Sequence, residues 1–207
     1  MISTYMQMIA LLEISISAAV IFIWLLQKLV PGEITFAMRI LLLFILGNLL
    51  FWPLGMSMQL PLAAYVRGVT GDLSLVTLLL LWSSILPKSK ATPIGVKVAI
   101  GLIAILFYPA ALGLGMTDPY AWGYGSLVLL IFVLIFAVIC GLANWAKGVW
   151  ILAFAIMAWS VHWHESSNLW DYVLDPFLAV WAIYSIFYAL YRKRREKAQS
   201  GYLFRAG

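Results

Sequence analysis

The sequence predicts an all-α integral membrane protein, a polytopic bundle of about seven transmembrane helices with six as the alternative count. Three observations predict this class. Hydrophobic residues make up 65% of the 207 residues and charged residues only 10%, whereas soluble domains are about half apolar and about a quarter charged. Apolar runs extend from one end of the chain to the other. Lys and Arg recur in every second connection between those runs, as expected of helices that cross a membrane in alternating directions.

The spans are assigned to the apolar runs, since a helix needs about 20 apolar residues to cross a bilayer. The runs cover residues 3–29, 34–55, 73–86, 94–115, 124–142, 149–161 and 172–191. The third and sixth runs are short, so we expect residues 60–72 and 145–148 to extend them. We therefore predict a single transmembrane domain over residues 1–191, followed by a short basic cytoplasmic tail over residues 192–207.

The orientation of the spans follows from their basic residues, which accumulate on the cytoplasmic side of a membrane. These residues lie at alternate connections and after the last span: Lys28, Arg39, Lys88, Lys90, Lys97, Lys147, Arg192, Lys193, Arg194, Arg195 and Lys197. The intervening connections, 51–59, 116–123 and 162–171, contain no Lys or Arg. The pattern predicts an outside N-terminus and a cytoplasmic C-terminus, with a bacterial inner membrane as the default location. We read the basic tail as an anchor on anionic lipid rather than as a nucleic-acid site.

Polar and ionisable side chains inside a membrane are costly and indicate functional sites. In the predicted topology they gather in the outer half or at the outer surface. Five are candidate ligand-binding residues: Glu13, Asn48, Arg67, Asp72 and Tyr108. Five are candidate catalytic residues: His162, His164, Glu165, Asp171 and Asp175. We expect Asp171 and Asp175, four residues apart, to share one face of the last helix.

Arg67 and Asp72 are separated by two glycines, Gly68 and Gly71, which permit a break in the helix. An arginine in such a break offers a planar fork suited to the phosphate of an anionic or phosphorylated lipid. The alternative is that Arg67 pairs with Asp72 or Glu13 and only holds helices together. Glu13 likewise either packs as a hydrogen-bonded carboxyl group or serves a proton relay.

The two histidines of the chain, His162 and His164, stand beside Glu165 in a pattern that resembles a weak zinc ligand set. Trp163 between them is typical of the aromatic belt at a membrane surface, and Ser167 or Asn168 is suited to capping the last helix. We expect no metal and no cofactor. The sequence contains neither a Gly-x-Ser-x-Gly elbow nor a Walker A loop.

Three functions remain in competition. The leading hypothesis is a membrane subunit or lipid-binding partner of a periplasm-facing enzyme that acts on an envelope or lipid-linked substrate, with a membrane or periplasmic protein as its partner. The alternative is a small membrane hydrolase or transferase that uses the five candidate catalytic residues, with Arg67 as phosphate anchor. The third is a transporter or channel, which the scarcity of polar groups in the inner half disfavours. Whether the chain is an enzyme stays open.

Overall fold

The computed structural model of the chain describes residues 2–55, 59–87, 89–125 and 127–203. Within these ranges the elements are helices and turns without any strand, which confirms the all-α class. Two helical stretches, Thr4–Leu29 and Ile94–Leu114, are long and apolar enough to cross a membrane. Four shorter apolar stretches accompany them: Phe36–Phe51, Leu75–Ile85, Leu127–Leu142 and Ala146–Ser160. The count of seven spans therefore stays a prediction.

The described residues divide into two compact units. One consists of the ranges 1–90 and 122–175, and the other of 91–121 and 176–207. The first contains all the elements that bear on the candidate site. In the second, α5 (Ile94–Pro109) packs against α9 (Pro176–Leu203). Gly101 allows this close packing, because a Cβ there would lie 3.1 Å from the side chain of Ile186.

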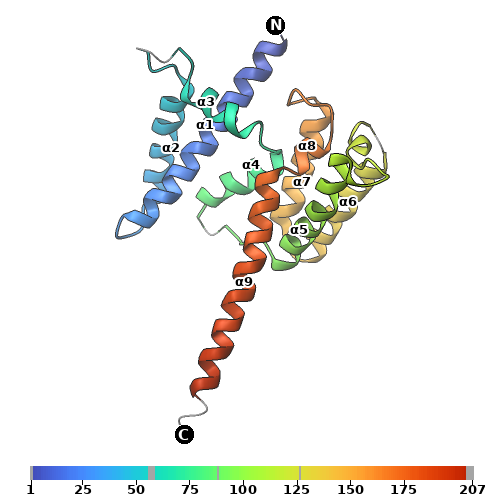
Figure 1. Cartoon of the computed structure of the whole chain (residues 1–207). Helices are drawn as coiled ribbons and strands as arrows, with labels where there is room; N and C mark the ends of the chain where they lie inside the picture. Colours follow the sequence, from blue (N-terminus) through green and yellow to red (C-terminus); the bar gives the residue numbers. More distant parts are fainter. Residues whose placement is uncertain (1, 56–58, 88, 126, 204–207) are drawn as a thin grey trace. The chain divides into compact units, whose positions relative to one another are not determined.

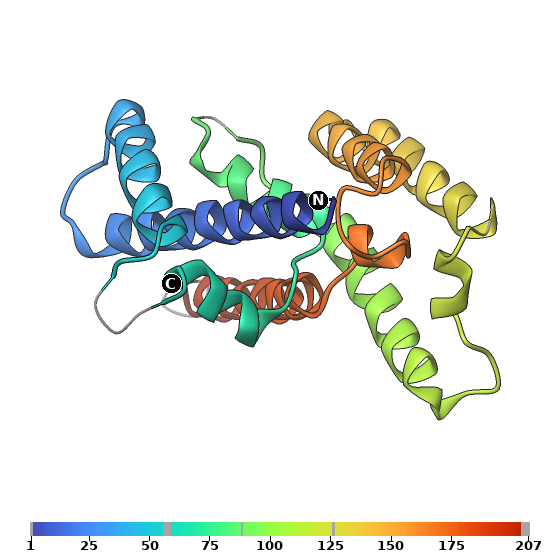
Figure 2. The same ribbon diagram turned by 90° about the horizontal axis from the view of Figure 1, so that it is seen from above.

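The first unit begins with α1 (Ile2–Leu29) and α2 (Phe36–Phe51), which lie side by side as a helical hairpin (Figures 1 and 2). The side chain of Gln27 closes the turn, since its Nε2 donates to the Gly32 carbonyl at 2.8 Å and its Oε1 accepts from the Ile34 backbone N–H at 2.9 Å. Gly32 takes a φ of +108°, which a residue with a Cβ rarely adopts.

The expected extension of the third span is wrong, because residues 60–72 contain a separate helix, α3 (Leu62–Thr70). Gly71 ends α3 with a φ of +70°, and α4 (Leu75–Trp82) begins anew after the N-cap Ser74. The glycine break predicted from the sequence is thus present, and it divides one expected span into two helices. Both helices pack against α1.

The helix in the sixth predicted run is extended as expected, since α7 (Ala146–Ser160) begins three residues before the predicted boundary at residue 149. It pairs with α6 (Leu127–Leu142) through a three-residue connection and also packs against α4. The connection ends at Trp145, whose buried ring lies so close to Gly148 that a Cβ there would overlap it.

The predicted start of the last span is also wrong. A short helix, α8 (Trp170–Val173), ends at the extended residue Leu174, and α9 begins only at Pro176. Proline favours the first turn of a helix and disfavours helical geometry in the residue before it. Asp171 and Asp175 therefore do not share the face of one helix. α9 continues past the predicted tail boundary to Leu203, while Lys88 and residues 204–207 lie outside the described residues.

Candidate functional site

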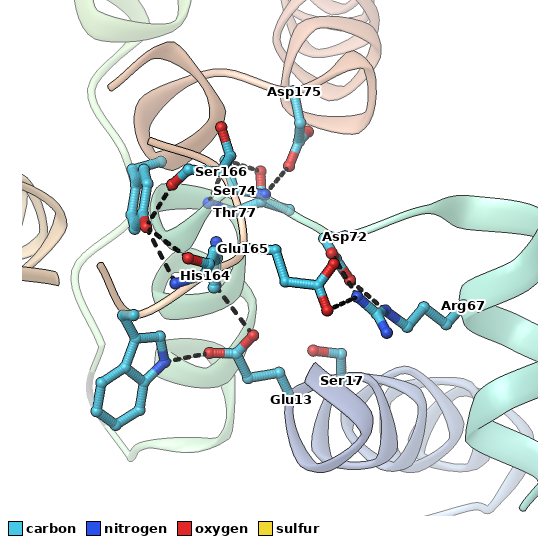
Figure 3. Close-up of polar contacts among 12 residues, drawn as sticks. Glu13, Ser17, Arg67, Asp72, Ser74, Thr77, His164, Glu165, Ser166 and Asp175 are labelled. Atoms are coloured by element: carbon cyan, nitrogen blue, oxygen red, sulfur yellow. Dashed lines mark hydrogen bonds and ion pairs between the residues drawn. The ribbon is translucent and has the colours of Figure 1, made fainter. Parts of the chain in front are cut away.

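Most of the candidate residues meet where the connection between α7 and α9 approaches α1, α3 and the start of α4. We call this group the polar cluster. It consists of Glu13, Arg67, Asp72, Ser74, Trp163, His164, Glu165, Ser166, Asp171, Tyr172 and Asp175. Figure 3 shows the Glu13 carboxylate directed at His164 and the Arg67 guanidinium directed at Asp72 and Glu165.

Glu13 holds the connection on α1 through both of its carboxylate oxygens. Oε1 accepts a 2.8 Å hydrogen bond from Trp163 Nε1, and Oε2 lies 3.1 Å from His164 Nε2. Glu13 and His164 are each only 7% exposed. A buried carboxylate requires such partners, because loss of its hydration is otherwise strongly unfavourable.

Tyr172 fixes the His164 ring from the opposite side. The two rings stack with centroids 4.9 Å apart, and the buried Tyr172 hydroxyl accepts from the His164 backbone N–H at 3.0 Å. The same hydroxyl donates to the Ser166 carbonyl at 3.0 Å. Burial raises the pKa of Tyr172 above its ordinary value. The hydroxyl therefore stays protonated at neutral pH and keeps the donor on which this contact depends.

Arg67 forms a bidentate ion pair with Asp72, with Nε 2.5 Å from Oδ1 and Nη2 2.8 Å from Oδ2. This is one of the two structural pairings considered from the sequence. Its Nη2 also lies 3.9 Å from the half-exposed carboxylate of Glu165. The hydrogen bond to Asp72 raises the pKa of Arg67 above its ordinary value, so the guanidinium is cationic throughout the accessible pH range.

Asp171 and Asp175 each accept a hydrogen bond within the polar cluster. Asp175 Oδ2 accepts a 2.7 Å hydrogen bond from the Ser74 backbone N–H at the start of α4, across 101 residues of sequence. Asp171 Oδ2 accepts from Ser166 Oγ at 2.5 Å. Asn168, one of the two expected caps of the last helix, accepts from the backbone N–H of Trp170, the first residue of α8, at 2.9 Å and is not the N-cap of α9.

Three candidates lie outside the polar cluster. Asn48 is exposed on α2, and its Nδ2 donates to the Phe44 carbonyl of its own helix at 2.8 Å. Tyr108 belongs to α5 in the other compact unit. His162 is exposed and takes a φ of +53° just after α7. Among the residues that the structure describes, no three His, Cys, Asp or Glu side chains are grouped closely enough to hold a metal ion.

Sequence reasoning missed Trp163 and Tyr172 as members of the site. Trp163 was assigned to an interfacial belt, yet its indole N–H is a donor to Glu13. The available signal was the need of a carboxyl group in an apolar helix for donors from elsewhere in the chain, which aromatic N–H and O–H groups supply. Comparison of the chain with protein-family models, with curated proteins and with solved structures finds no match.

Proposed function

We propose that this chain is a polytopic inner-membrane subunit with about seven spans, in which the polar cluster holds the connection between α7 and α9 as a docking surface for an enzyme of the outer compartment. The single observation that supports this proposal is the way in which the charged groups of the cluster engage one another. Glu13 bonds Trp163 and His164, Arg67 pairs with Asp72, and Asp175 bonds the backbone of α4. Such pairings fix a surface in place.

Five residues of the connection between α7 and α9 remain exposed despite its internal contacts. These are Val161, His162, Trp163, Glu165 and Ser167. A rigid loop that mixes aromatic, apolar and polar groups is suited to binding a protein, because little conformational entropy is lost when it docks. The proposed substrate of the complex is an envelope component or a lipid-linked molecule, with an anionic or phosphorylated lipid bound near Arg67.

The proposed complex is tested by purification in mild detergent followed by native mass spectrometry. We expect the chain to carry one protein partner with a domain in the outer compartment, together with a phosphorylated lipid. An Arg67→Gln variant should lose the lipid, because glutamine lacks the charged fork. An Asp72→Asn variant should retain more lipid than wild type, because it releases the donors that Asp72 now occupies.

The outcomes separate the two parts of this proposal. Recovery of the chain without any protein partner, under conditions where known membrane complexes survive, would contradict the subunit role. Equal lipid retention in wild type, Arg67→Gln and Asp72→Asn would show that Arg67 is purely structural and that the cluster binds no lipid.

The proposed topology is tested with single cysteines at Ser89 and Thr117, both of which are exposed. The native Cys140 is buried and is first replaced by alanine. In intact cells a membrane-impermeant thiol reagent should label position 117 and leave position 89 unlabelled until the membrane is opened. Labelling of position 89 alone in intact cells would reverse the proposed orientation.

A further inference from the structure

The contact between Glu13 and His164 constrains where the histidine carries its proton. An ionised carboxylate only accepts hydrogen bonds. Oε1 of Glu13 already accepts from the Trp163 indole, and Oε2 lies 3.1 Å from Nε2 of His164. With Glu13 ionised, Nε2 must therefore be the protonated nitrogen of the imidazole, and Nδ1 carries the free electron pair.

Nδ1 of His164 has no hydrogen-bond partner among the residues that the structure describes, although the His164 side chain is only 6% exposed. Among all the described residues, Trp145 Nε1 is the one side-chain nitrogen or oxygen that is fully enclosed and has no hydrogen-bond partner. Nδ1 is therefore not fully enclosed. The imidazole thus has one nitrogen, Nε2, that is held by Glu13, and a second, Nδ1, that has no partner among the described residues.

The orientation of this nitrogen is held by several contacts. Tyr172 stacks on the imidazole face and accepts from the His164 backbone N–H. Trp163 and His164 both bind Glu13, so the carboxylate cannot rotate away without the loss of two hydrogen bonds. A carboxylate that orients a histidine from one side is the arrangement by which proteins present imidazole as a base on the other side.

We propose that His164 is a preoriented base, in which Nδ1 accepts a proton from a water molecule or from a hydroxyl group of a ligand. The O–H bond breaks toward Nδ1, and the electron pair stays on the ligand oxygen. The resulting imidazolium is stabilised by Glu13 through the Nε2–H bond. The other ionisable groups around this centre are Arg67 on α3, Asp72 just after the end of α3, Glu165 beside His164, and Asp171 and Tyr172 on α8. This chemistry goes beyond a docking role, and its test needs no partner protein.

The chain has only two histidines, so a His162→Asn variant leaves His164 as a single reporter. Asparagine suits this position because it tolerates the positive φ of residue 162. The variant is labelled with ¹⁵N-histidine, and the nitrogen chemical shifts are recorded in detergent across a pH series. At neutral pH we expect a protonated shift for Nε2 and an unprotonated shift for Nδ1. Acidification should move the Nδ1 signal far more than the Nε2 signal, reversibly, in the folded protein.

A Glu13→Gln variant in the same background is the matched control. Its amide can present either an oxygen or an N–H group, so the single tautomer should be replaced by a mixture. Two results would overturn the proposal in the Glu13 protein: a neutral imidazole protonated on Nδ1, or an Nδ1 signal that stays unchanged on acidification until the protein unfolds. An imidazole protonated on Nδ1 would mean that Glu13 is protonated and donates a hydrogen bond to Nε2. An unchanged Nδ1 signal would mean that water does not reach Nδ1.

Discussion

Replacing His164 with alanine is expected to lower the free energy of unfolding by about 3–5 kcal/mol. The His164 and Glu13 side chains are 6% and 9% exposed, so the substitution leaves the Glu13 carboxylate buried with Trp163 as its one remaining donor. It also removes the ring that stacks on Tyr172. Reversible denaturation of the purified chain in detergent, monitored by tryptophan fluorescence, measures this loss.

His162→Asn is the matched control for His164→Ala. It changes a histidine two residues away that is exposed and lies outside the polar cluster, so its effect should stay within about 0.5 kcal/mol. A double variant, Glu13→Ala with His164→Ala, should cost clearly less than the sum of its single changes, because neither Glu13 nor His164 then remains buried without the other. Strict additivity, or equal effects at both histidines, would contradict the buried pairing.

Replacing Gly123 with alanine is expected to destabilise the first unit by about 3 kcal/mol. A Cβ at this position would overlap the side-chain amide of Asn168. Neither side can easily withdraw, because the Gly123 carbonyl accepts from the Leu169 backbone N–H at 3.0 Å and the Asn168 side chain accepts from the Trp170 backbone N–H at 2.9 Å. Thermal unfolding in detergent measures the change, and loosening of residues 163–173 should appear as faster amide exchange.

Gly68→Ala serves as the control, because a Cβ at that glycine meets nothing within 4 Å. It should be neutral or mildly stabilising in α3. The overlap itself is tested by adding Asn168→Ser, which shortens the side chain while keeping an oxygen that can accept from the Trp170 backbone N–H. Recovery of part of the lost stability in the double variant is expected. A Gly123→Ala protein as stable as wild type would show that the two segments do not approach so closely.

Several features of the fold could be predicted from short stretches of sequence. The apolar runs predicted where the helices α1, α2, α5 and α6 lie to within a few residues, because periodicity and hydrophobicity are properties of the local chain. The glycines around Arg67 predicted a break before Asp72, and Gly71 supplies the required positive φ. Pro176 carried an equally local signal for the start of α9, which the apolar pattern beginning at residue 172 obscured.

The sequence predicted several of the residues that belong to the candidate site but not which of them contact one another. The sequence identified Glu13, Arg67, His164 and Asp175 as costly groups that need partners, and it gave two options for Arg67. It contained nothing that distinguished Asn48, which bonds its own helix, from Glu13, which bonds a distant loop. The burial of a polar side chain depends on which neighbouring helix covers it, and that information lies outside the local pattern.

Composition and local pattern alone therefore establish an apolar, all-helical chain with a small set of ionisable side chains and breaks at defined glycines and prolines. Only the tertiary structure decides which of those side chains pair. Glu13 meets His164 across 151 residues, and Asp175 meets the Ser74 backbone across 101. Hydrogen bonds require heavy-atom distances near 3 Å and suitable angles. Those conditions are set by how α1, α3, α4 and α8 pack, because a helix of given sequence can present the same carboxylate to many different neighbours.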